Sequence, residues 1–297
     1  MQTIVAITDL ALAQLEEHLT SHAPERGGAL LGMCNAEVIT DFLPDPDATT
    51  TEVSYVPSSH LNRRVGEGEA DGLRRLYGVA HSHPGRFDQP SGPDRAAFAK
   101  GLALNPHLAT FYAPIITLAH PCVEPDVPDS IWPLSGGARL TLHAARRGGH
   151  PGEVELFRPW LRVLPIGREV RDFASQLAFA TQHAATHVFD VAEINGVPVL
   201  TANITCGAWS VLFGFSAHYP LAAPLVLVTP SSGGTRQSHL RWPVFGGSLF
   251  ETFHKPDLPA VKPRFYYPKK NLHANPEIAP FEDFTFINNQ QHHQNTL

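Results

Sequence analysis

The sequence contains few cysteines, little charge and no long apolar run. Its three cysteines, Cys34, Cys122 and Cys206, are widely spaced and odd in number, which does not suggest a disulfide framework. Charged residues make up 17% of the 297 residues, against about 25% in average globular domains, so a solvated disordered chain is excluded. The net charge of -6 argues against nucleic acid or an anionic membrane as the main partner.

Two further absences bear on location. No apolar stretch approaches the roughly 20 residues that a membrane span needs. The first 18 residues carry no Lys or Arg before an apolar run, which makes them a poor signal peptide. We therefore expect a soluble protein of a reducing compartment, the cytoplasm, with enough hydrophobic residues (43%) to bury a sizeable core.

Histidine and proline, by contrast, are abundant, with 17 and 27 residues. The first half reads as a mixed α/β domain. Strands are expected at 3–7, from Gly27, at 76–83 and in a hairpin that closes before about residue 160. Helices are expected after the N-cap Thr8, with Leu12, Leu15 and Leu19 on one face, and from Pro93 to Gly101. Residues 44–70 are expected to be polar and loop-rich.

A second unit is expected to start near Pro159. One helical face carries Ile166, Val170, Phe173 and Leu177, and a strand meander follows with a two-residue turn at Asn195-Gly196. From about Lys255 the chain is rich in Pro, Asn, Gln and His. We therefore divide it into 1–158, 159–254 and a tail, 255–297.

The segment His81 to Asp94, HSHPGRFDQPSGPD, carries the chemistry. On a strand, His81 and His83 project to the same face, because side chains alternate with a period of two. Asp94 lies in the first turn of the next helix, so a loop can fold its carboxylate back toward the two imidazoles. Two His and one carboxylate leave a fourth tetrahedral position open, as in catalytic zinc sites. Asp88, in the connecting loop, is expected to be a surface residue.

The same residues have a purely structural interpretation. Ser91-x-x-Asp94 resembles a capping box at a helix start, with Pro93 in the first turn. The two interpretations are compatible, because one helix start can serve as both cap and ligand.

The motif H-S-H-P, six residues and then S-x-x-D resembles that of the JAMM (JAB/MPN+) metalloproteases at every specified position. PERGGALLG, with Glu25, is similar to the upstream element of that family. The resemblance implies an MPN (cytidine-deaminase-like) fold over residues 1–158. It also implies Zn²⁺ on His81, His83 and Asp94, Glu25 as general base and Ser91 as a donor to the oxyanion. Such enzymes cleave after the C-terminal glycine of ubiquitin or a ubiquitin-like protein, in conjugates or precursors.

Residues 159–254 resemble the ubiquitin-conjugating (UBC/RWD) fold, an α+β domain, through a helix, a meander and Tyr219-Pro220-x-x-x-Pro224. The second proline stands one residue later than in that family, and no cysteine follows Cys206. A catalytically inert, partner-binding module is therefore the expectation. Its partners would be conjugating or activating enzymes of the same pathway.

Two alternatives remain open for the first domain. The same site could hydrolyse a small amide or a sulfur-carrier adduct, or the domain could be a non-enzymatic MPN scaffold. Dependence of activity on a folded ubiquitin-like domain would separate the first alternative from the isopeptidase. The presence of all the ligands speaks against the scaffold.

Overall fold

The computed structural model describes residues 3–20, 24–51, 54–83, 85, 87–118, 130–150, 152–194, 196–216, 218–220, 222–230, 236–238 and 249. The expected tail, 255–297, lies outside these residues. Among the described residues, none of the helices has both the length and the hydropathy required to cross a membrane.

The first lobe is an α/β domain, as the sequence predicts, and it is built on a sheet with both parallel and antiparallel strand pairs. Within the described residues its strand order is β10-β9-β7-β6-β2-β3-β1-β11, and β8 pairs with β9 off this path. The strand pairs β1–β3, β1–β11 and β6–β7 are parallel, and the other pairs are antiparallel. The strands are β1 (Ile4–Thr8), β2 (Gly27–Met33), β3 (Val38–Pro44), β6 (Arg74–His83), β7 (Phe111–Thr117), β8 (Ile131–Pro133), β9 (Arg139–Arg147), β10 (Val154–Phe157) and β11 (Trp160–Leu164).

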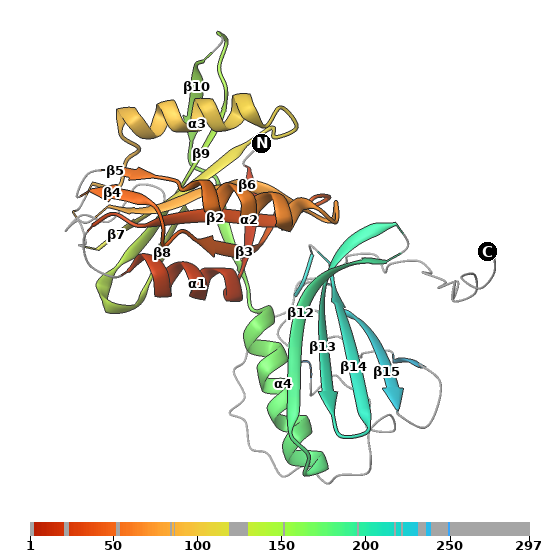
Figure 1. Cartoon of the computed structure of the whole chain (residues 1–297). Coiled ribbons are helices and arrows are strands. Elements are labelled where there is room, and N and C mark those ends of the chain that lie inside the picture. The colour runs from red at the N-terminus through yellow and green to blue at the C-terminus, as the bar shows by residue number, and fades with distance from the viewer. Residues whose placement is uncertain are drawn as a thin grey trace, which may run out of the picture. The chain divides into compact units, whose positions relative to one another are not determined.

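Helices cover both faces of this sheet (Figure 1). Helix α1 (Asp9–Leu19) starts at the predicted N-cap, because Thr8 Oγ1 accepts a hydrogen bond from the Ala11 N–H at 3.1 Å. Its buried leucines, the predicted Leu12, Leu15 and Leu19, pack on one face of the sheet. On the other face, α3 (Gly92–Leu104) packs Phe98 and Leu102 against Phe111.

Helix α3 runs past its predicted end. We expected Gly101 to end the helix, but the helix continues to Leu104. A Cβ at Gly101 would lie 2.7 Å from the ring of Phe111, so this glycine permits close packing of α3 on β7. The glycine is required by the packing and is not a C-cap.

The expectation of a loop over residues 44–70 is wrong. This stretch contains β4 (Thr49–Thr51), β5 (Ser54–Val56) and α2 (Ser59–Glu69), with β4 and β5 paired as an antiparallel hairpin. Helix α2 is capped by Ser58, whose Oγ accepts from the Leu61 N–H at 3.1 Å. Because Leu61 is its one buried residue among those described, α2 has no apolar stripe that the sequence could reveal.

The second lobe consists of α4 (Ile166–Thr181) and an antiparallel sheet in the order β12-β13-β14-β15-β16. The predicted apolar face of α4 is buried. The hairpin is also confirmed, since Ile194 pairs with Val197 and Gly196 has a φ of 77°. The expected boundary at residue 158 falls just before β11, which pairs with β1 in the first sheet. The strands are β12 (Ala185–Ile194), β13 (Val197–Cys206), β14 (Trp209–Phe215), β15 (Leu225–Pro230) and β16 (Arg236–Ser238).

Candidate metal centre

Strand β6 places His81 and His83 at its C-terminal end, on the face that α3 covers. Both residues are buried, with 3% and 7% of their surface exposed. Their Nε2 atoms are 3.0 Å apart. Two ring nitrogens at this separation repel one another unless a proton or a cation lies between them. The predicted convergence of the two imidazoles is therefore confirmed, and it creates a place for a cation.

Asp94 reaches the histidines from the first turn of α3. Its Oδ1 is 3.4 Å from His81 Nε2, and its Oδ2 is 3.7 Å from His83 Nε2. Burial alone would raise the pKa of Asp94, but hydrogen bonds from His81, His83 and Ser91 lower it far below its usual value. The carboxylate is thus held in its charged, ligating form.

The separations within this group fit a small tetrahedral metal ion. Zinc–nitrogen and zinc–oxygen bonds of about 2.0–2.2 Å place the ligand atoms of a regular tetrahedron about 3.3–3.6 Å apart. The His81–His83 separation of 3.0 Å and the shortest distances from these rings to the Asp94 carboxylate, 3.4 Å to Oδ1 and 3.7 Å to Oδ2, lie around that range. His81, His83 and Asp94 can therefore hold a metal ion with one position left open.

Glu25 is brought to the same group by strand register. Gly27 of β2 pairs with His81 of β6, and the Ser82 N–H donates to the Arg26 carbonyl at 2.8 Å. Continuing this antiparallel register puts Glu25 opposite His83, on the same face of the sheet. Glu25 is 6% exposed, and its burial raises the pKa of its carboxyl, an effect that His83 and His81 partly offset. The raised pKa makes the Glu25 carboxyl a better proton acceptor than an exposed glutamate.

Ser91 forms the predicted capping box with Asp94. Its Oγ accepts from the Asp94 N–H at 3.3 Å, and its N–H and Oγ donate to Asp94 Oδ2 at 2.7 and 2.6 Å. The structural interpretation of this pair is therefore confirmed. Because Oδ2 is held by Ser91, Oδ1 is the oxygen left to face His81.

Tyr55, which the sequence did not single out, packs beside the ligands. Its ring is nearly parallel to that of His81, with centroids 6.4 Å apart. A Cβ at Gly27 would lie 2.4 Å from the Tyr55 ring, so a glycine is needed at that position. The Tyr55 hydroxyl donates to the carboxylate of the buried Asp45 at 3.2 Å. Only the fold reveals this contact, because Tyr55 lies on the unpredicted β4–β5 hairpin.

In the loop after β6, Phe87 contacts the site and Asp88 contacts two arginines beside it. Phe87 stacks on His83 with centroids 6.0 Å apart, and its carbonyl accepts a hydrogen bond from His83 Nδ1 at 2.6 Å. Asp88, expected at the surface, is half-buried and faces Arg139 at 3.7 Å and Arg158 at 3.9 Å. The expectation for Asp88 is wrong, because both arginines lie too far along the chain for local spacing to reveal them.

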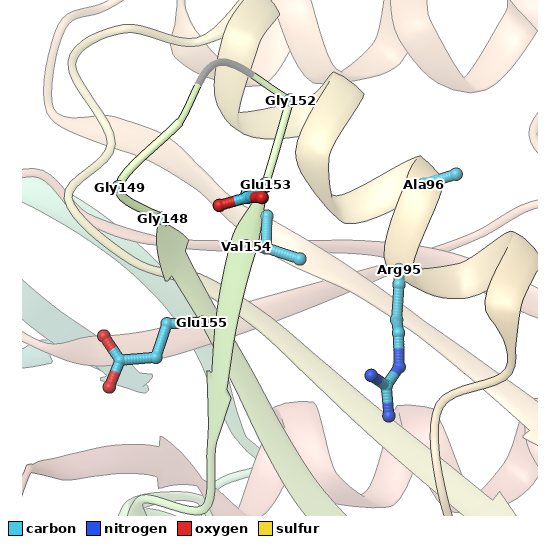
Figure 2. Close-up of a pocket in the computed structure, with 8 residues that line it drawn as sticks. All are labelled: Arg95, Ala96, Gly148, Gly149, Gly152, Glu153, Val154 and Glu155. Carbon is cyan, nitrogen blue, oxygen red and sulfur yellow. The ribbon is translucent and has the colours of Figure 1, made fainter.

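A hollow of about 540 Å³ lies between α3 and the β9–β10 hairpin (Figure 2). None of its lining residues is a metal ligand or Glu25, so it is not the metal site. Its lining consists of Arg95, Ala96, Gly148, Gly149, Gly152, Glu153, Val154 and Glu155.

Two of the solved structures that are similar to this chain come from prokaryotes. One is the solution structure of protein DSY2949 from Desulfitobacterium hafniense, with 16% identity over 54% of this chain and 94% of that one, and a TM-score of 0.36. The other is the crystal structure of AF2198, a JAB1/MPN domain protein from Archaeoglobus fulgidus. It has 17% identity over 54% of this chain and 98% of that one, and a TM-score of 0.27. Among curated proteins, none matches the sequence.

Residues 8–126 match a family model described as prokaryotic homologs of the JAB domain. The matched range contains α1, β6 and α3, and with them Glu25, His81, His83, Ser91 and Asp94. Residues 8–126 of this chain are therefore similar to a JAB domain, and they contain a His-His-Asp group that can hold a metal.

Proposed function

We propose that this protein is a zinc-dependent isopeptidase that cleaves after the C-terminal glycine of a ubiquitin-like protein, in a conjugate or a precursor. The observation that carries the proposal is the convergence, on one face of the sheet, of the three ligands and Glu25. A structural metal site would need a fourth protein ligand. Among the described residues no fourth His, Cys, Asp or Glu belongs to the group.

Glu25 would move the proton that amide hydrolysis requires. A zinc ion held here would lower the pKa of a water molecule from about 15.7 to about 7 and so provide a nucleophile at neutral pH. The Glu25 carboxylate would accept the proton of that water and return it to the leaving amine. Its raised pKa brings it closer to the pH at which both transfers are efficient.

Ser91 would donate its hydroxyl to the oxyanion that develops on the substrate carbonyl. That hydroxyl donates to Asp94 Oδ2 at 2.6 Å, so it would have to turn from the ligand to the substrate. Losing one such donor typically costs about 10²–10³ in rate. The Ser91 N–H would keep holding Asp94 while the hydroxyl moves, because it donates to the same oxygen.

The second lobe would recruit a partner of the same pathway as an inert UBC-like module. Tyr219 is buried beside Phe215, after β14, the third strand of its sheet. Cys206 is fully buried and contacts Thr181 Oγ1 at 3.0 Å, which leaves it unsuited to carry a thioester. A module of this kind would bring a conjugate or a conjugating enzyme to the metal centre.

The test compares two substrates with the zinc-loaded protein. One is a folded ubiquitin-like protein with an amide-linked reporter on its terminal glycine, and the other is the short peptide of its last residues with the same reporter. Faster cleavage of the folded substrate, abolished by a chelator and restored by zinc, would support the proposal. Equal rates would assign the site to small amides, and no cleavage of either substrate would favour a scaffold. A deletion within the second lobe should lower the rate of cleavage of the folded substrate and leave the rate for the peptide unchanged.

A further inference from the structure

The loop after β6 is anchored on the face of the sheet that carries the metal centre. We call residues 87–90 of this loop the ligand loop. It connects the strand that carries His81 and His83 to the helix that carries Asp94. Its anchors come from β9 and from residue 158, more than 45 residues further along the chain.

The first anchor is a charge cluster on Asp88. The carboxylate lies 3.7 Å from Arg139 and 3.9 Å from Arg158. The Arg139 side chain is only 9% exposed, and its Nε is buried with no hydrogen-bond partner. A buried guanidinium with so few partners depends strongly on the nearby carboxylate. Asp88 is therefore held over β9 by a charge that water screens only in part.

The second anchor is a hydrogen bond to the backbone of the same residue. His143 is 3% exposed, and its Nε2 lies 2.6 Å from the Asp88 carbonyl oxygen. Because a carbonyl only accepts, Nε2 must carry the proton and donate it. Burial also lowers the pKa of His143 to about 4, so the ring is neutral near pH 7 and this tautomer is fixed.

The neighbouring peptide group transmits this anchoring to the metal centre. The Phe87 carbonyl accepts from His83 Nδ1 at 2.6 Å, so Nδ1 carries the proton. In the neutral ring the lone pair is then on Nε2, the atom that faces His81 and Asp94. The position of one carbonyl thus decides both the tautomer and the orientation of a metal ligand.

We propose that Asp88, Arg139, Arg158 and His143 are positioning residues, which hold the Phe87 carbonyl against His83 and so pre-form the metal site. The proposal rests on the proposed metal centre and extends it to residues that do not touch the metal. Without the anchors the loop would move, and His83 would lose the acceptor that orients it. Metal binding would then have to order both the loop and the ring, which weakens affinity.

The first experiment uses Asp88→Asn in the full chain and Co²⁺ as the probe. Outer partners of metal ligands typically contribute 10–100-fold to metal affinity. The variant should bind Co²⁺ about 10–100-fold more weakly than wild type in a chelator competition, with an altered visible spectrum. The matched control is Asp71→Asn, which removes the same charge from another Asp–Arg pair, 3.2 Å from Arg74, and should bind like wild type.

The second experiment uses His143, and it also guards against misfolding of the Asp88 variant. His143→Gln keeps an N–H that can donate to the Asp88 carbonyl, whereas His143→Leu removes it. We expect weakened Co²⁺ binding in the leucine variant and near wild-type binding in the glutamine variant. Circular dichroism of both variants checks that each is folded. Rescue by glutamine would show that the donor matters, since general destabilisation would affect both variants.

The inference and the proposed function can fail separately. Wild-type Co²⁺ affinity and spectrum in Asp88→Asn, or in a folded His143→Leu, would overturn the positioning role whatever the activity. Wild-type protein that binds Co²⁺ tightly but cleaves no substrate would refute the isopeptidase and leave the positioning role standing. Wild-type protein that binds no Co²⁺ would refute both.

Discussion

The carboxylate of Asp9, in the first turn of α1, accepts a hydrogen bond from the backbone N–H of Gly167 at 2.7 Å. Its other oxygen accepts from the Arg168 N–H at 2.8 Å. These two N–H groups lie in the first turn of α4, which follows Pro165 and receives no cap from that residue's own side chain. A side chain of the first lobe therefore caps the helix that begins the second.

Replacing Asp9 should destabilise the protein through this cap. Asp9→Ala leaves two N–H groups without their acceptor and should lower the free energy of unfolding by about 1 kcal/mol. Asp9→Asn keeps one acceptor oxygen, so its free energy of unfolding should fall by less. Urea unfolding measures both variants, with Asp47→Ala, whose side chain is 60% exposed, as the control. An alanine variant as stable as wild type would contradict the capping role.

Metal analysis of the purified protein should find about one equivalent of zinc per chain. His83→Ala should lose most of it, because the remaining pair of ligands is too few for a stable tetrahedral site. His60→Ala removes a half-exposed histidine and should keep the metal. Full zinc retention in a protein that carries both His81→Ala and His83→Ala would be incompatible with the site described above.

Glu25→Gln should separate catalysis from metal binding. Glutamine keeps the shape of the side chain but cannot accept and return a proton. The rate should fall by about 10²–10⁴-fold while the zinc content stays near that of wild type. Turnover close to normal would mean that another residue is the base. Loss of zinc together with activity would make Glu25 a ligand.

The ligand set could be predicted from sequence because each part of it is local. The spacing of His81 and His83 matches the period of a strand, and Ser91-x-x-Asp94 matches a helix cap. Both patterns lie within 14 residues of chain. Glu25 has no local pattern of this kind. Its place beside His83 depends on the pairing of β2 with β6, and the family resemblance supplied what spacing alone could not.

His143 should make stability depend on pH below neutrality. Burial lowers its pKa from 6.5 to about 4, so the folded state disfavours the protonated ring. The stability contributed by the neutral ring is fully present above pH 6.5 and falls as the pH drops toward about 4, by about 3 kcal/mol at most. Urea unfolding at several pH values should show this loss in wild type and a smaller one in His143→Gln. Identical pH profiles of stability in wild type and His143→Gln would contradict a role of His143 in this loss.

Cys206 should be inert toward thiol reagents in the folded protein. Cys206 is fully buried and forms a hydrogen bond with the Thr181 hydroxyl, whereas Cys34 is partly exposed. In a Cys122→Ser background, Cys34 should be modified first, and Cys206 only after unfolding. A reducible adduct on Cys206 with an activating enzyme would refute the inert module.

The residues that sequence patterns missed share one physical reason. Tyr55 and Asp88 both contact residues that are distant in sequence and that the fold brings close. Tyr55 packs against Gly27 and donates to Asp45. Asp88 faces Arg139 and Arg158. Neither Tyr55 nor Asp88 has a periodicity or a spacing that marks it. Helix α2 was missed for a related reason, since a helix that buries one leucine looks like a polar loop.

Strand β11 has a practical consequence for dissecting the protein. It pairs in parallel with β1 from Ile4↔Trp160 to Thr8↔Leu164 and leads into α4 two residues later. A chain cut at residue 158 would strip β1 of this neighbour and leave unpaired N–H and C=O groups along a mostly apolar five-residue strand. An exposed edge strand of this kind can pair with other chains, and the protein then aggregates. A cut after residue 164 keeps β11 paired with β1. We therefore expect the fragment that ends at residue 164 to stay in solution better than the fragment that ends at residue 158.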